Sequence, residues 1–89
     1  MPLYSIRRRL GENTQEDLDA AVFRAIVCAF QFDGLEWQRS FWNKEAGEVN
    51  CIYEAQEPGQ IEEHARVSRI SCDSIVEVRE VRPEPYIHG

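Results

Sequence analysis

The sequence predicts an α+β fold in which one antiparallel sheet is covered on a single face by two helices. Segments with the two-residue alternation of strands are interrupted twice by segments with the 3.6-residue period of helices. The resulting order is strand, helix, strand, strand, helix, strand, and the two central strands are close enough to form a hairpin. With right-handed crossovers, this order gives the ferredoxin-like βαββαβ arrangement.

Composition limits the possible classes of protein. The chain has 89 residues, and we expect one domain at residues 1–82 and a C-terminal tail at residues 83–89. The net charge of -6 disfavours nucleic-acid binding, because a phosphate backbone would be repelled. A helix needs about 18 apolar residues to span a bilayer, and no apolar run approaches this length. The arginines at 7–9 interrupt the apolar core that a signal peptide would need. Three cysteines at spacings that match no zinc motif favour reduced thiols, so we expect a cytoplasmic protein without a membrane partner.

The first half of the domain is expected to hold a strand at residues 3–10 and a helix that starts after Thr14. One face of the strand carries Tyr4, Ile6, Arg8 and Leu10. The run of arginines at 7–9 is interpreted as strand charges paired with carboxylates of this acidic chain. Residues 11–13 are expected to form a turn. Thr14 is a good N-cap with Asp17 near the capping-box position, and the helix should end by Gly34.

The second half is expected to hold strands at residues 35–43 and 48–55, a helix at about 58–68 and a strand at 75–81. In the second strand, Trp37, Arg39 and Phe41 should share one face, with Trp42 on the other. Pro58 suits the first turn of the helix. The spacing i, i+3, i+4, i+7 predicts that the buried face of this helix carries Ile61, His64, Ala65 and Ser68.

The sheet is predicted to have one face that the helices leave open. The second and last strands are apolar on both faces, and a large exposed apolar patch usually marks an interface. We therefore expect a homodimer packed sheet to sheet, a dimeric α+β barrel, with Trp37, Phe41 or Trp42 in the contact.

The densest set of reactive side chains lies at residues 51–64. Cys51 and Tyr53 are two residues apart and share one strand face, whereas Glu54 takes the other. If Cys51 and Tyr53 lie on the side of His64, metal or acid–base chemistry follows. If Glu54 lies on the side of His64 instead, His64 is better explained as a structural residue whose hydrogen bond to Glu54 fixes the helix. Burial of His64 should favour its neutral form at pH 7.

These residues give two sets of candidates. As metal ligands we expect His64, Cys51 and Glu54, and as catalytic residues His64 and Tyr53. The surface carboxylates and His88 are further metal candidates. Each core candidate also has a purely structural interpretation: a hydrogen-bonded core histidine, a packed cysteine, and a tyrosine that supplies apolar area.

Four segments resemble a known family. They are Met1-Pro2-Leu3-Tyr4, Cys51-Ile52-Tyr53-Glu54-Ala55, Glu63-His64-Ala65 and Ile75-Val76-Glu77-Val78-Arg79-Glu80-Val81. They are similar to those of small bacterial proteins catalogued as a domain of unknown function or as nickel-binding-protein-like. The resemblance implies a ferredoxin-like fold and a homodimer. The nickel label of the family suggests a metal ligand, and a small-molecule ligand is the alternative.

Three functional hypotheses follow. The first is a small homodimeric metal-binding protein that sequesters or buffers nickel or another soft divalent transition metal. The second is a dimeric α+β barrel enzyme, such as a cofactor-free oxygenase, isomerase or cyclase. Its pocket would surround His64 and Tyr53 beside Trp37 and Phe41. The third is a binding module without chemistry.

Overall fold

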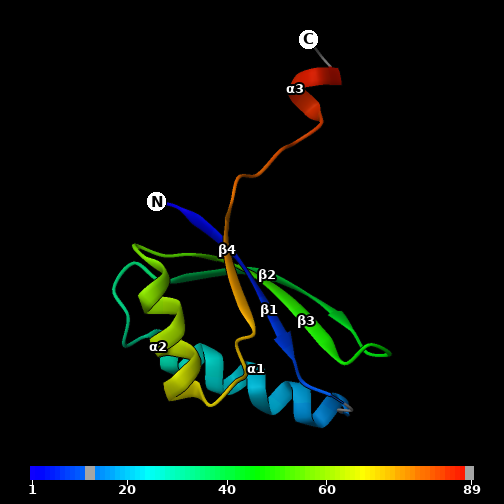
Figure 1. Ribbon diagram of the computed structural model, residues 1–89, viewed down its shortest axis with the longest axis vertical. Helices are drawn as coiled ribbons and strands as arrows, with labels where there is room; N and C mark the ends of the chain where they lie inside the picture. The colour runs from blue at the N-terminus through cyan, green and yellow to red at the C-terminus, as the bar shows by residue number, and fades with distance from the viewer. Residues whose placement is uncertain (12–13, 88–89) are drawn as a thin grey trace.

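The computed structural model describes residues 1–11 and 14–87. Its elements are β1 (Leu3–Arg9), α1 (Gln15–Ala29), β2 (Glu36–Asn43), β3 (Glu48–Glu54), α2 (Pro58–Ser68), β4 (Ser74–Val78) and α3 (Glu84–Ile87). The described strands form an antiparallel sheet in the order β2-β3-β1-β4. Helices α1 and α2 lie side by side on one side of this sheet (Figure 1). The α+β class is confirmed, and the order is consistent with the ferredoxin-like arrangement.

Helix α1 begins at the predicted cap. The Thr14 hydroxyl accepts a hydrogen bond from the Asp17 backbone N–H at 3.2 Å, and the Asp17 carboxylate accepts one from the Thr14 backbone N–H at 3.0 Å. This reciprocal pair is a capping box, which satisfies two backbone donors at the helix start. Of the turn expected at residues 11–13, Glu12 and Asn13 lie outside the described residues.

Helix α2 has the bounds and the buried face that its sequence period predicts. It begins at Pro58 and ends at Ser68, and Arg69 follows in the left-handed conformation with φ 59°. Its buried residues are Ile61, His64, Ala65 and Ser68. Glu62 and Glu63 are exposed on the opposite face. The helix therefore places one imidazole against the sheet.

Strand β2 contains a β-bulge that the sequence alternation did not reveal. The register between β2 and β3 shifts between Trp37 and Arg39. An extra residue in one strand reverses which face the following side chains occupy. The prediction that Trp37 shares a face with Arg39 and Phe41 is therefore wrong. Trp37 and Trp42 pack against the core on the helix side, whereas Arg39 and Phe41 lie over the open face.

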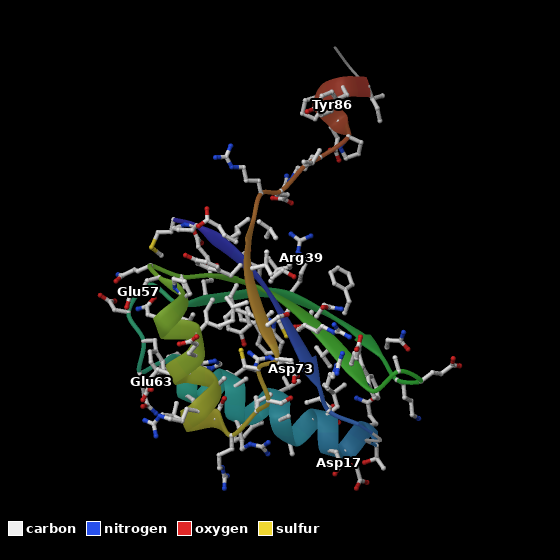
Figure 2. All side chains as sticks on the ribbon, in the orientation of Figure 1. Asp17, Arg39, Glu57, Glu63, Asp73 and Tyr86 are labelled. Carbon is white, nitrogen blue, oxygen red and sulfur yellow. The ribbon has the colours of Figure 1, made fainter. Side chains whose placement is uncertain are left out.

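Strand β4 ends at Val78, three residues before its expected end. Val78 pairs with Leu3, which is the first residue of β1, so the chain beyond it has no neighbouring strand to pair with. The chain then leads away from the sheet to the short helix α3 (Figure 1), where Tyr86 is 79% exposed (Figure 2). We call residues 79–87 the C-terminal arm. Among the described residues, no helix has the length and hydropathy that are needed to cross a membrane.

The turn between β2 and β3 is fixed to the end of β1 through Gly47. Its carbonyl oxygen accepts hydrogen bonds from the backbone N–H groups of Leu10 at 2.7 Å and Gly11 at 3.1 Å. Gly47 has φ +67°, and a Cβ atom there would lie 2.4 Å from the Gly11 carbonyl oxygen. Only glycine combines this backbone conformation with so close an approach.

We expect Gly47→Ala to lower the free energy of unfolding by about 1–3 kcal/mol from backbone strain alone. Gly59→Ala is the matched control, because a Cβ at Gly59 meets only the flexible Glu57 side chain at 3.3 Å. This control should leave stability unchanged or raise it by up to about 1 kcal/mol. Urea titration of both variants measures the difference, and equal midpoints would contradict the prediction.

Candidate functional site

The helix-covered face of the sheet carries the side chains of the candidate site. Every second residue along β1 and β3 is buried: Tyr4, Ile6, Arg8, Val49, Cys51 and Tyr53. His64 of α2 is also fully buried, and its ring lies 5.7 Å from the ring of Tyr53, centroid to centroid. Cys51 and Tyr53 therefore lie on the side of His64. Glu54 lies on the opposite face, and a His64–Glu54 hydrogen bond is not formed.

The bulge in β2 adds two side chains to this face. The Trp37 ring stacks on the Tyr53 ring, with centroids 6.1 Å apart and planes 12° from parallel. The Trp37 indole N–H donates to the Ser40 hydroxyl at 2.7 Å. The extra residue between them makes this contact possible, because it brings Ser40 to the same side as Trp37.

A cavity of about 160 Å³ lies between α1 and the sheet. Helix α1 contributes mainly small and aliphatic side chains, and the sheet contributes aromatic, thiol and guanidinium groups. The lining residues are Arg8, Leu10, Leu18, Ala21, Val22, Ala25, Trp37, Ser40, Trp42, Val49, Cys51, Tyr53 and Ile70. None of these described residues is an aspartate or a glutamate. Of the expected pocket residues, Tyr53 and Trp37 line the cavity, His64 lies behind Tyr53, and Phe41 is on the other face of the sheet.

Arg8 supplies the charge in this cavity. Its residue surface is only 3% exposed, although arginine is almost never fully buried unless it is paired. Its Nη1 donates to the Ser71 carbonyl oxygen at 2.9 Å, and its Nη2 is buried without a hydrogen-bond partner. The guanidinium carbon lies 5.8 Å from the centre of the Tyr53 ring. In the part of the chain that the structure describes, Arg8 forms no ion pair.

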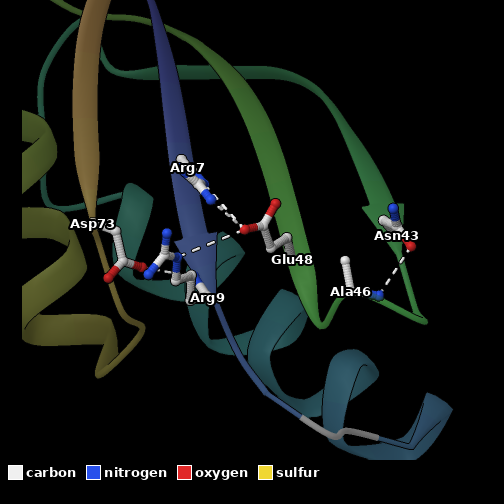
Figure 3. A network of polar contacts seen from close by, with 6 residues as sticks. All are labelled: Arg7, Arg9, Asn43, Ala46, Glu48 and Asp73. Carbon is white, nitrogen blue, oxygen red and sulfur yellow. Dashed lines mark hydrogen bonds and ion pairs between the residues drawn. The ribbon is translucent and has the colours of Figure 1, made fainter.

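The neighbouring arginines, Arg7 and Arg9, differ from Arg8 because both form ion pairs. Arg7 and Arg9 both reach Glu48, with nitrogen–oxygen distances of 2.5 Å and 3.6 Å (Figure 3). The Arg9 backbone N–H also donates to the Asp73 carboxylate at 2.6 Å. The prediction that all three arginines pair with carboxylates is confirmed for Arg7 and Arg9 and wrong for Arg8. Strand alternation sends Arg8 alone to the helix side, and this was visible in its alternation with Tyr4 and Ile6.

Tyr53 acts as a neutral group in this setting. Burial raises the pKa of Tyr53 to about 12, and the positive charge of Arg8 opposes only part of that shift. Its hydroxyl therefore stays protonated at neutral pH. It can donate a hydrogen bond to a ligand, but it does not supply a base.

His64 is held as one neutral tautomer. Its Nε2 lies 2.9 Å from the Ala25 carbonyl oxygen, so Nε2 carries the hydrogen and donates it. The Nδ1 atom then has a free lone pair, and it is buried without a partner. Burial lowers the pKa of His64, the Ala25 carbonyl opposes this shift, and the charge of Arg8 adds to it. The lowered pKa agrees with the expectation that His64 is neutral at pH 7.

The candidate metal ligands do not form one site within the chain. His64 and Cys51 face the core from α2 and β3, whereas Glu54 lies on the open face, 3.7 Å from the N-terminal ammonium group. Within residues 1–11 and 14–87, no group of three His, Cys, Asp or Glu side chains is close enough to hold a metal ion. His88 lies outside the described residues.

Cys72 lies in a second groove that the sequence did not indicate. The groove lies between α2 and β4, and Glu62 and Asp73 also line it. Burial raises the pKa of the Cys72 thiol, Arg8 opposes this, and the two carboxylates add to it. All three cysteines of the chain are free thiols.

The fold and the site together define a small α+β protein with a sheet-and-helix cavity around a buried arginine. The chain belongs to the family described as nickel responsive protein SCO4226-like, whose model matches residues 4–78. The crystal structure of SCO4226 from Streptomyces coelicolor A3(2) is similar, with a TM-score of 0.78 and 13% sequence identity. The match covers 92% of this chain and 100% of that one, and it shows the shared fold. A comparison with curated protein sequences gives no significant match.

The depressed pKa of His64 predicts how stability depends on pH. Because the unfolded chain binds a proton near the ordinary pKa of 6.5 and the folded chain does so only at lower pH, the unfolded state binds more protons in between. The contribution of neutral His64 is therefore complete above pH 6.5 and decreases as the pH falls below it.

We expect His64→Gln to remove this part of the pH dependence, since glutamine keeps a donor for the Ala25 carbonyl and does not titrate. Urea unfolding of both proteins at several pH values between 7.5 and 5 measures the difference. Parallel stability curves for the variant and the natural protein would show that His64 does not titrate with folding.

Proposed function

We propose that this protein is a small homodimeric metal-binding protein that carries nickel or a similar divalent ion for sequestration or buffering. The description of its family as nickel responsive is the observation that carries the proposal. The composition supports it, because 16 aspartates and glutamates against 10 lysines and arginines give an acidic chain that attracts cations.

The donor geometry supports a site that two copies complete. A first-row divalent ion takes four or more nitrogen, oxygen or sulfur ligands. The described residues of one chain bring no three such side chains together. A second copy doubles the donors at a shared surface, so dimer formation and metal binding should depend on each other.

The open face of the sheet supports sheet-to-sheet pairing as a dimeric α+β barrel. Phe41 and Val76 are 63% and 56% exposed there. A shallow depression on the same face is lined by further apolar side chains, those of Leu3, Ile52 and Val78. The C-terminal arm also exposes Val81, Tyr86 and Ile87, and it extends beyond the body of the domain, where a second copy can receive it (Figure 1). Trp37 and Trp42, which the sequence analysis also placed in this contact, line the cavity on the helix side instead.

We expect Phe41→Glu to convert the dimer into a monomer, because it places a charge within the proposed apolar contact. The matched control is Phe23→Glu on α1, since Phe23 is 68% exposed but lies outside the open face. Sedimentation velocity at micromolar concentration measures both. A monomeric natural protein, or a dimer that Phe23→Glu disrupts and Phe41→Glu does not, would exclude this interface.

We further expect nickel affinity to follow the dimer. Isothermal titration of tag-free protein should give tight binding for the natural chain and for Phe23→Glu, and at least about a tenfold loss for Phe41→Glu, or 1.4 kcal/mol. The nickel affinity of His64→Ala reports on a donor in the core, and that of Cys72→Ser reports on a donor in the groove between α2 and β4. Cys28→Ser is titrated as the control. Equal nickel affinity in monomeric and dimeric variants would contradict a shared site, and absence of nickel binding would contradict the function.

The cavity favours a second function, a dimeric α+β barrel enzyme such as a cofactor-free oxygenase, isomerase or cyclase. The supporting observation is that an apolar cavity contains a few polar groups, those of Arg8, Ser40 and Tyr53. Mass spectrometry of ligands after prolonged incubation with the protein tests this alternative. Ligands that bind in the cavity and are recovered unchanged would exclude an enzyme for those compounds.

A further inference from the structure

The buried guanidinium of Arg8 lacks the partner that such a group needs. Removing a guanidinium from water costs several kcal/mol, and this cost is usually offset by a carboxylate or phosphate. Arg8 has one backbone carbonyl acceptor, from Ser71, and one nitrogen, Nη2, with none. An anion placed at Nη2 would satisfy both the hydrogen-bond donor and the charge.

The cavity beside Arg8 is partly open to solvent, and its lining favours an anion that carries an apolar body. Its volume of about 160 Å³ is close to the about 150 Å³ apolar cavity that accommodates benzene. Apart from Arg8, its walls are largely apolar, with Val22 and Ala21 on one side and Trp37 and Trp42 on the other. A bare inorganic anion would leave this apolar surface unfilled, whereas a neutral hydrocarbon would leave Arg8 unpaired.

We propose that this cavity binds a small organic monocarboxylate with an apolar body about the size of a benzene ring. The carboxylate accepts hydrogen bonds from the Arg8 guanidinium, and the apolar body lies between α1 and the tryptophans of β2. Tyr53 lines the same cavity, and its hydroxyl, which stays protonated, is a further hydrogen-bond donor. The inference rests on the cavity alone, so it holds whether or not the protein carries nickel or catalyses a reaction.

Benzoate is the probe that matches this description. We expect benzoate to raise the thermal midpoint and to shift the indole N–H NMR signals, since both tryptophans of the chain line the cavity. Benzamide has the same ring without the charge, and inorganic phosphate has the charge without the ring. Benzamide should bind at least about tenfold more weakly than benzoate, because a hydrogen bond between charged groups contributes about one or two powers of ten. Phosphate should also bind more weakly than benzoate, because it leaves the apolar walls of the cavity uncovered.

Two pairs of variants locate the site. Arg8→Met should lower benzoate affinity about ten- to a hundredfold, and Arg8→Lys should lose less because it keeps the charge but not the planar fork. Ala21→Phe fills the cavity from α1 and should abolish binding. Ala20→Phe, one residue earlier on the same helix, faces a different groove and should bind benzoate as the natural protein does.

The outcomes separate the proposal from its alternatives. Equal binding of benzoate and benzamide would show that the charge of Arg8 does not contribute to binding. Equal binding of benzoate and phosphate would show that the apolar walls do not contribute. No benzoate-dependent change, or an unchanged affinity in Ala21→Phe, would overturn the site as a whole. If Arg8→Met does not fold, two measurements still test the proposal. They are the comparison of the three ligands on the natural protein, and the comparison of Ala20→Phe with Ala21→Phe. A natural protein that binds benzoate but not nickel would count against the proposed function only, and one that binds nickel but not benzoate would count against the carboxylate site only.

Discussion

A permanent positive charge inside a small core is the constraint on which the chemistry of this protein depends. An arginine guanidinium is a fixed positive charge in proteins, so the groups around Arg8 must adjust to it. Its charge acts to lower the pKa of His64, Tyr53 and Cys72, although burial is the largest cause of the shift in each case. For His64 the two effects act together and favour the neutral imidazole. The positive charge of Arg8 therefore makes the core unfavourable for an additional cation.

This charge separates the two kinds of ligand proposed for the chain. A divalent cation between His64 and Cys51 would have one imidazole and one sulfur donor, with the guanidinium of Arg8 in the same core. Repulsion between like charges is strong where water is excluded. An acidic surface or a shared interface offers the opposite field, because the chain carries a net charge of -6. Cations are thus favoured outside the core and anions within the cavity, which is why a nickel role and a carboxylate site are compatible.

Much of the fold followed from local patterns, whereas the site depended on long-range contacts. The order of the elements, the Thr14 cap and the buried face of α2 came from spacing and capping chemistry alone. The bulge in β2 could not be found in this way, since an extra residue leaves no mark on a segment that is apolar on both faces. Its consequence was large, because it moved Trp37 to the cavity and left Phe41 on the open face.

The candidate site was predicted in its parts and not in its organisation. Alternation correctly paired Cys51 with Tyr53 and placed both away from Glu54, but only the packing of α2 decided which pair His64 would meet. Alternation likewise set Arg8 beside Tyr4 and Ile6. The absence of a carboxylate partner depends on which residues of α1, β2 and the loop after α2 surround the guanidinium, and those are distant in sequence. A lone charge on an apolar strand face was the available signal.

Strand β1 joins the two proposed surfaces because its faces serve different purposes. Its register against β3 pairs Arg8 with Val49 on the helix side, and it leaves Leu3 and Ser5 on the open side. A slip of one residue would bury Arg7 and Arg9 and expose Arg8, so the apolar pattern of the whole strand keeps Arg8 inside. A second copy on the open face would not cover the cavity, which lies beyond the sheet under α1. Pairing of two chains and binding of a small anion therefore use opposite faces of the same strand and do not compete for space.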